Sequence, residues 1–385
     1  MRKKKCIGDL GTIITGNTPP RNRPELYGNH TPFIKATDIS ESEKYTYNPE
    51  ECYSEEGYNK YIKSLIPKGS TCVVTIGSIG KKMTMAHCDL FINQAMNAII
   101  PNACFDSEYV YYAVKNVLGN IKTLDSGTAS GRENVSKSAF SKMEIWVEEE
   151  LPIQQRIATI LSRYDSLIEN YQKQIKLLEE SAQRLYKEWF VDLRFPGHEN
   201  VQIVDGVPEG WEKKKAGDLI SKVRRTKQVS ANNYLNSGYI PVIDQSRNYI
   251  AGYTNDIESL VEVTIPYIVF GDHTRVLKYV PFSFAKGADG TQLIMSNDLE
   301  RMPQSLFYNS LIEIDLSNYS YARHFKYLKE ESILVPSKDI AQRYDKVVSQ
   351  YCQSIQKSRD QIRHLTEARD RLLPKLMNGE INVNR

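Results

Sequence analysis

The sequence predicts an α+β protein made of two similar halves, in which two globular domains are separated by a long antiparallel two-helix coiled coil. Three observations support this prediction. Short motifs of the first half recur in the second, each half ends in a long seven-residue apolar repeat, and the remaining segments contain short strand-like runs. The length of 385 residues also exceeds that of one ordinary domain. We therefore expect an internal pseudo-two-fold repeat.

The first globular domain is expected over residues 1–150. Its clearest strand candidates are TCVVTI at 71–76 and NAII at 97–100, and residues 107–118 have the pattern of a helix. Its motifs KKKCIGDL (3–10), PFI (32–34) and VTIG (74–77) return as KKKAGDL (213–219), PVI (241–243) and IVFG (268–271). The second domain, expected over residues 196–335, therefore repeats the first.

The two helices are expected over residues 151–195 and 336–385. In both segments apolar side chains alternate in steps of three and four, and six residues of the first recur 187 positions later in the second. Two amphipathic helices on separate cores are the alternative, but the long narrow seam favours a coiled coil between them. Pro374 and Gly379 are expected to end the second helix. The predicted seam consists of Leu161, Tyr164, Ile168, Ile175, Leu178, Leu185, Val348, Tyr351, Ile355, Ile362, Leu365 and Leu372.

Connectivity sets the direction of the helices. The first helix leaves the first domain and leads to the second domain, so a second helix that shares its seam must run back. The pair is then antiparallel, and residues 152–190 would span roughly 55–60 Å at 1.5 Å per residue. The expected molecule is a dumbbell with an approximate two-fold axis.

Composition excludes several classes of protein. Apolar residues are 41% and charged residues 25%, which is the balance of a soluble globular chain, and no run approaches the ~20 apolar residues of a membrane span. No apolar run follows the basic N-terminus, so we expect a cytoplasmic protein that does not bind membranes. The six cysteines lack metal-ligand spacing, so no metal site is expected. The net charge is only +3, although residues 213–227 hold seven basic residues and one acidic residue.

Catalytic motifs are weak. GSIGK at 77–81 has two residues between its glycines, where a phosphate loop has four, so a turn with an exposed lysine is the better interpretation. Asp272 and His273 can form an acid–base pair, but no nucleophile motif accompanies them. We therefore expect no catalytic residue and no cofactor in this chain.

Four motifs, taken in order, resemble the specificity subunits of type I restriction–modification systems. They are LPIQQRIA (151–158), KEWFVDLRFPG (187–197), VPEGW (207–211) and LLPKLMNGEI (372–381). The resemblance covers almost the whole chain, although the first domain lacks the Pro-x-Gly-Trp sequence that opens the second.

The resemblance implies a non-catalytic subunit that recognises double-stranded DNA. Residues 1–150 and 196–335 would be target recognition domains, each reading one half of a split sequence. The helices would set the spacer and dock two methyltransferase subunits, which bring S-adenosylmethionine and methylate adenine. Motor-nuclease subunits would join for restriction and use ATP and Mg²⁺.

The resemblance also implies that polar loops between strands contact DNA. Arginine can bridge guanine, glutamine or asparagine can bridge adenine, and lysine mainly contacts phosphate. The candidates in the first domain are Lys35, Thr37, Asp38, Ser78, Lys81, Lys82, Asn93, Gln94, Thr128 and Arg132. The candidates in the second domain are Gln245, Ser246, Arg247, Asp272, His273, Thr274, Arg275, Lys286 and Asp289.

Two other functions fit part of the pattern. A non-catalytic adaptor with two protein-binding heads on a coiled coil would suit the small net charge. A degenerate duplicated nuclease would need a carboxylate cluster in both halves, and the sequence has none. The repeated polar loops and the whole-chain resemblance favour the DNA-recognition hypothesis.

Overall fold

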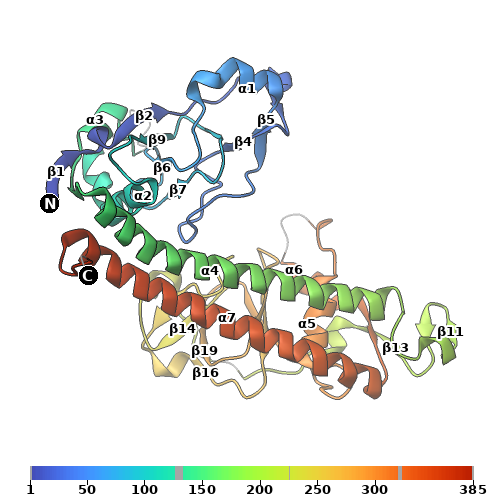
Figure 1. Ribbon diagram of the computed structural model, residues 1–385. Helices are drawn as coiled ribbons and strands as arrows, with labels where there is room; N and C mark the ends of the chain where they lie inside the picture. Colours follow the sequence, from blue (N-terminus) through green and yellow to red (C-terminus); the bar gives the residue numbers. More distant parts are fainter. Residues whose placement is uncertain (1, 126–132, 225, 320–322, 384–385) are drawn as a thin grey trace. The chain divides into compact units, whose positions relative to one another are not determined.

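The computed structural model describes residues 2–125, 133–224, 226–319 and 323–383. The chain divides into two compact units, one of Met1–Tyr171 with Gln361–Arg385 and one of Gln172–Asp360. Each unit contains a head of short strands and helices together with segments of two long helices, α4 and α7, which continue from one unit into the other (Figure 1). The predicted α+β class is confirmed.

The head of the first unit is built from three small sheets. The first strand, β1 (Arg2–Cys6), pairs antiparallel with the last, β10 (Glu144–Glu148). The second sheet has the order β2 (Gly11–Thr15), β9 (Met96–Pro101), β6 (Thr71–Val74) and β7 (Met83–Met85). The third has the order β3 (Tyr27–Gly28), β5 (Glu51–Tyr53), β4 (Thr31–Ile34) and β8 (Phe91–Ile92). The α-helices of this head, in the part of the chain that the structure describes, are α1 (Glu55–Tyr61), α2 (Ser107–Asn116) and α3 (Lys137–Lys142).

The head of the second unit has a similar plan, with one strand fewer in its central sheet. Its outer pair is β13 (Glu212–Lys215) with β21 (Ser332–Val335). One sheet has the order β18 (Leu277–Val280), β17 (Tyr267–Gly271) and β20 (Thr291–Ile294). The other has the order β15 (Gly252–Thr254), β14 (Ile240–Ile243), β19 (Phe284–Lys286) and β16 (Leu260–Val261). The remaining elements are a small hairpin, β11 (Ile203–Val204) with β12 (Val207–Pro208), and the helices α5 (Gln304–Ile312) and α6 (His324–Glu330).

The correspondence between the heads confirms the internal repeat. In both, a central strand (β6 or β17) lies between two antiparallel neighbours, β7 and β9 or β18 and β20. In both, a second sheet contains one parallel pair, β4 with β8 or β14 with β19. A parallel pair is uncommon in so small a mixed sheet, so its presence at the same place in each head is a specific sign of duplication.

The long helices are α4 (Leu151–Tyr186), which ends in a π-helical turn (Lys187–Val191), and α7 (Lys338–Asn378). Within the first unit Arg369 of α7 contacts Asp165 of α4 at 2.5 Å. Within the second unit Arg359 contacts Glu179 at 2.9 Å, and the Tyr344 hydroxyl donates to the carbonyl of Ala182 at 3.3 Å. In the second unit the later of these two α7 residues, Arg359, pairs with the earlier of the two α4 residues, Glu179, so the helices run antiparallel.

The predicted end of the second helix was wrong in one respect. Pro374 lies inside α7, which continues to Asn378 and stops before Gly379, whose φ of 77° is left-handed. A proline removes one helical hydrogen bond. The helix continues nonetheless because its last turn places Leu376 and Met377, both almost fully buried, in the core of the first unit.

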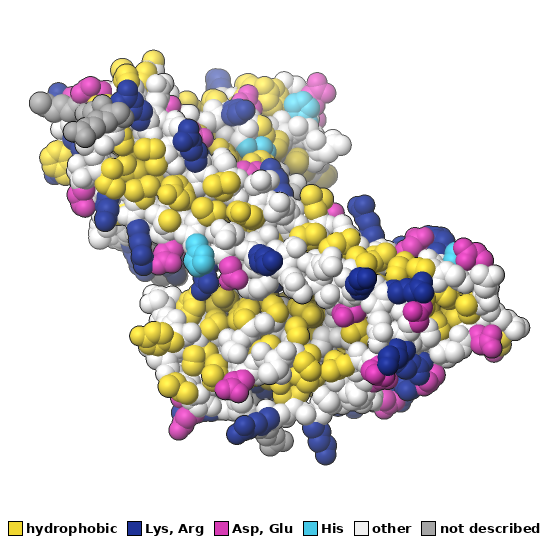
Figure 2. Space-filling model, turned by 60° about the horizontal axis from the view of Figure 1, so that its bottom comes forward, with side chains coloured by type: hydrophobic (Ala, Val, Ile, Leu, Met, Phe, Trp, Pro, Cys, Tyr) yellow, Lys and Arg dark blue, Asp and Glu magenta, His cyan; other side chains and the backbone are white. Residues whose placement is uncertain are grey.

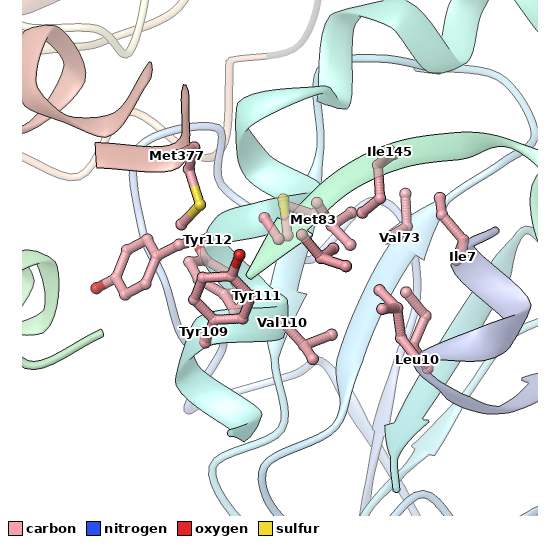
Figure 3. Close-up of a cluster of buried hydrophobic side chains, with 14 of the residues drawn as sticks. Ile7, Leu10, Val73, Met83, Tyr109, Val110, Tyr111, Tyr112, Ile145 and Met377 are labelled. Carbon is pink, nitrogen blue, oxygen red and sulfur yellow. The ribbon is translucent and has the colours of Figure 1, made fainter. Parts of the chain in front are cut away.

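That core joins the end of α7 to the head of the first unit. Its members include three tyrosines of α2 and the strand residues Val73 and Ile145 (Figure 3). Met377 belongs to the same cluster. Burial of one such side chain stabilises a fold by about 1.5–3 kcal/mol, so the C-terminal turn is an integral part of this unit.

Candidate nucleic-acid interface

Three loops of the first head meet beside the parallel strand pair. The loop after β4, residues 35–38, joins the loop after β8 because the Asn93 amide donates to the carbonyl of Ile34 at 3.0 Å. The turn between β6 and β7 joins them because the Lys82 ammonium lies 3.4 Å from the carbonyl of Ala36. The structure therefore brings together the candidates of loops 35–38, 78–82 and 93–94, which are separate segments of the sequence.

The candidates of the first head differ in how freely they can meet a ligand. Lys35 is mostly buried, and its ammonium lies 2.5 Å from Glu50. The hydrogen bond to Glu50 raises the pKa of Lys35, so this charge is already partnered. The Asp38 carboxylate accepts from the Lys35 amide at 2.8 Å and closes the turn. Thr37, Ser78, Lys81 and Gln94 are exposed, whereas Lys82 and Asn93 are half-buried. Thr128 and Arg132 lie outside the described residues.

Three loops of the second head meet in the same way, and the side chain of Gln245 ties them together. Its amide nitrogen donates to the carbonyl of Asp289 at 2.9 Å, and its amide oxygen accepts from the His273 amide at 3.1 Å. The Thr274 hydroxyl donates to the backbone carbonyl of Gln245 at 2.6 Å. Gln245 therefore holds these three loops together, and both ends of its side-chain amide are already used.

Two further candidates of the second head also have structural partners. Asp272 is only 4% exposed, and its carboxylate accepts from the Phe325 amide at 2.8 Å at the start of α6. Its side chain is therefore directed to α6, whereas the neighbouring His273 is exposed. The guanidinium of Arg275 donates to the carbonyl of Leu316 at 2.9 Å.

The remaining candidates of the second head lie on its surface. Arg247, Thr274 and Asp289 are exposed, while Ser246 and Lys286 are half-buried. Arg275 and Asp289 have φ angles of 62° and 51°, in the left-handed region that non-glycine residues rarely adopt. Strained backbone of this kind persists where surrounding contacts impose it, and it is concentrated at functional sites.

The predicted seam residues all lie in α4 or α7, and none of them is exposed. Leu161, Ile168, Val348 and Ile355 are buried. The half-buried members are Tyr164, Ile175, Leu178, Leu185, Tyr351, Ile362, Leu365 and Leu372.

The sequence analysis did not predict two similar contacts, one in each unit, between a tyrosine of the head and a long helix. In the first unit the Tyr47 hydroxyl donates to the Glu169 carboxylate of α4 at 2.7 Å. In the second unit the Tyr249 hydroxyl lies 3.3 Å from the side-chain amide oxygen of Gln356 in α7. Glu169 and Gln356 are 187 positions apart, the spacing at which the helices repeat. The spacing of 187 positions could have identified Glu169 and Gln356 as equivalent helix residues, but nothing in the sequence identifies their tyrosine partners.

Surface charge is mixed rather than concentrated. Lys and Arg side chains are scattered among Asp and Glu on the face that Figure 2 shows. Many cations are already partnered, such as Lys227 with Asp256 at 2.8 Å. Among the described residues no three His, Cys, Asp or Glu side chains are grouped so that they could hold a metal ion. In the same part of the chain, every helix is too short or too polar to cross a membrane.

Comparison with known proteins gives concordant results. Residues 2–180 match the family model described as type I restriction modification DNA specificity domain. The chain is 27% identical over 408 aligned residues to the type I restriction enzyme MjaIX specificity subunit of Methanocaldococcus jannaschii, covering 98% of this chain and 93% of that one. It is 35% identical over 143 residues to the HindI specificity subunit of Haemophilus influenzae, covering 37% of this chain and 30% of that one.

A solved structure shows the same fold. The type I restriction-modification S subunit from M. genitalium superposes with a TM-score of 0.59 at 18% identity, covering 98% of this chain and 96% of that one. Residues 2–180 thus match the type I restriction modification DNA specificity domain, and the resemblance of the whole chain to type I specificity subunits is confirmed.

Proposed function

We propose that this chain reads a bipartite DNA target, one half-site per head, and docks methyltransferase subunits on α4 and α7. Its similarity to proteins named type I restriction enzyme specificity subunits supports a role in DNA sequence specificity. The chain itself supplies recognition and spacing, and the partner subunits supply S-adenosylmethionine and the chemistry of methylation. Motor-nuclease subunits that use ATP and Mg²⁺ would join the same assembly for restriction.

The observation that carries this proposal is the repeated meeting of three loops. Each head joins the loop after β4 or β14 to the loop after β8 or β19 and to the turn after its central strand. A surface that is duplicated in plan suits a ligand that presents similar features twice. DNA half-sites about one helical turn apart, ~34–36 Å, present the same groove face.

The side chains on the two surfaces differ, so the two half-sites should differ as well. The first surface exposes Thr37, Ser78 and Lys81, whereas the second exposes Arg247, His273 and Thr274. Hydroxyls and lysine suit phosphate oxygens and several bases, while arginine favours guanine edges. The target is therefore expected to be asymmetric.

The tied loops supply a rigid frame for recognition. Rigid loops lose less conformational entropy on binding than mobile ones, so more of the contact energy remains for discrimination between bases. The hydrogen bonds made by Gln245 and Asp38 serve this purpose, because each fixes a loop from within the protein.

The docking part of the proposal rests on exposed leucines of α4. Leu167 is 47% exposed and Leu177 is 62% exposed, and neither belongs to the buried seam. Their counterparts in α7, 187 positions later, are Ser354 and His364. Exposed apolar side chains on a helix suit a protein partner. The small net charge of +3 fits this view, since the isolated chain has little excess charge with which to hold DNA.

Methylation mapping tests the function. The chain is expressed with its neighbouring methyltransferase in a host free of DNA methylation, and adenine methylation is mapped by long-read sequencing. A split adenine motif that is present with the chain and absent without it is the expected result. If the host that expresses a verified soluble complex shows no methylated motif, the result would contradict the proposal and favour an adaptor.

A further inference from the structure

The second head contains a buried lysine, Lys278, that is not one of the candidate DNA-contacting residues. Lys278 lies in β18, opposite Val269 of the central strand, and is only 4% exposed. Its ammonium donates to the carbonyl of Asp244 at 2.8 Å and to the carbonyl of Asn248 at 2.5 Å. These carbonyls stand at the two ends of loop 244–248, so a single side chain closes the base of that loop.

The same loop is also braced from within. The Asp244 carboxylate accepts from the Ser246 amide at 2.9 Å and from the Ser246 hydroxyl at 2.6 Å. One oxygen of that carboxylate lies 3.8 Å from the Lys278 ammonium. The lysine thus contacts both ends of the loop and the carboxylate that shapes its middle, where Gln245, Ser246 and Arg247 lie.

The first head contains a similar lysine that makes one contact with the corresponding loop instead of two. Lys82, 196 positions before Lys278, precedes β7, the strand that corresponds to β18. Its ammonium lies 3.4 Å from the carbonyl of Ala36, in the loop after β4. The backbone carbonyl of Lys82 accepts from the Val74 amide at the end of the central strand. Both heads therefore place a lysine from the same strand neighbourhood under the loop that follows the parallel strand.

A buried lysine is a poor source of stability. Burial lowers the pKa of Lys278 to about 8, which shows that the surroundings disfavour its charge. Buried charges can often be replaced by apolar side chains with little loss of stability. Unlike an apolar side chain, the ammonium supplies several donors that converge on one irregular loop.

We propose that Lys278 is a positioning residue that fixes loop 244–248 in the shape that reads the second half-site. Lys82 does the same, with one contact instead of two, for loop 35–38 and the first half-site. The inference rests on the proposed function and adds to it the residues that set the geometry of recognition. Neither lysine needs to touch a base.

The test compares the methylation motifs produced by the complete methyltransferase complex with the wild-type chain and with Lys278→Met. The variant is expected to keep the first half-site and to lose discrimination in the second by about tenfold, the lower range of one base contact. Lys82→Met should give a smaller loss, confined to the first half-site. Lys213→Met, which alters an exposed lysine of β13 in the second head, is the matched control and should leave the motif unchanged.

Lys278→Arg provides the rescue. A guanidinium can donate to both carbonyls, and the lysine borders a cavity of about 280 Å³ that can accept the extra atoms. Discrimination should therefore return with arginine and stay low with Lys278→Gln, a comparison that decides the matter even where the methionine variant fails to fold.

An unchanged motif with Lys278→Met overturns the inference, and so does an equal loss at both half-sites with a lowered melting temperature. The motif of the wild-type complex distinguishes failure of this inference from failure of the proposed function. A wild-type complex without any motif contradicts the proposed function and the inference with it, whereas a normal wild-type motif beside an unaltered variant motif contradicts the inference alone.

Discussion

The charge of Lys278 makes the stability of the second head depend on pH in a predictable direction. Its folded-state pKa of about 8 lies below the ordinary value of 10.5. The unfolded chain therefore binds this proton more tightly, and the free energy of unfolding rises as the pH increases from about 8 to 10.5. The charged groups nearest to this ammonium are the Asp244 carboxylate, at 3.8 Å, and Arg247, which borders the same cavity.

Denaturant unfolding of the wild type and Lys278→Met at several pH values between 7 and 10 measures this effect as a difference. The wild type should gain stability relative to the variant as the pH rises above about 8, because only the wild type relieves a buried charge. A difference that stays constant over this range would show that the lysine is not buried in solution as it is in the structure.

Arg275 combines a left-handed backbone with a hydrogen bond to the carbonyl of Leu316. We predict that Arg275→Ala lowers methylation only through the second half-site, by about tenfold or more, since it releases a strained turn of the interface. Methylation rates on targets altered in one half at a time provide the measurement. Equal losses for changes in either half would refute the assignment.

At the scale of elements, the helix pair is asymmetric at one buried position. In the first unit Asp165 and Arg369 form an ion pair, and the Tyr112 hydroxyl also donates to Asp165 at 2.5 Å. The helix repeat of 187 positions places Cys352 and Ala182 at the equivalent sites of the second unit. The ion pair is thus specific to one unit, and a buried pair of this kind is better suited to fixing register than to adding stability.

We predict that Asp165→Ala destabilises the first unit by about 3–5 kcal/mol, because it leaves the Arg369 guanidinium buried without its carboxylate. The double variant Asp165→Cys with Arg369→Ala, which copies the second unit, should recover most of this loss. Denaturation midpoints of the three chains measure both effects. A double variant no more stable than the single one would contradict the explanation.

The elements themselves were largely predictable from sequence, for physical reasons. A seven-residue repeat is a local pattern, so the positions of α4 and α7 follow from residues such as Leu161 and Ile355. Strand runs around Val73 and Val269 are equally local. The exact end of α7 was not predictable, because Pro374 is a local stop signal that the burial of Leu376 and Met377 overrides.

The candidate interface could be predicted from the sequence only as a set of loops. Its segments could be chosen because polar residues follow strands, but the partners of each side chain depend on tertiary contacts. Gln245 and Asp272 have the residue types of DNA ligands, yet the structure gives their side chains internal partners. Lys278 has the residue type of a surface cation, yet it is buried.

At the scale of the whole molecule, the chain carries two similar heads, and two long helices continue from one unit into the other. Both helices are continuous across the boundary between the units, which falls between Tyr171 and Gln172 in α4 and between Asp360 and Gln361 in α7. Under the proposed function, spacing between half-sites should therefore depend on helix length, and base identity should depend on the heads.

Insertion of seven residues at both boundaries tests this division of roles. Seven residues add about 10 Å at 1.5 Å per residue while keeping the seam in phase, which corresponds to about three base pairs at 3.4 Å. The methylated motif should keep both half-sites and gain a longer spacer. Insertion of seven residues in an exposed surface loop serves as a control. An unchanged spacer would exclude the helices as the determinant of spacing.

The most direct test of the central claim, that each head reads its own half-site, is reciprocal methylation mapping with Lys81→Ala and Arg247→Ala. Both side chains are exposed, one on each interface, so neither change should disturb folding. The account predicts that Lys81→Ala alters methylation only through one half of the split motif and Arg247→Ala only through the other. Changes in the same half, or a motif that is not divided into two parts, would contradict it.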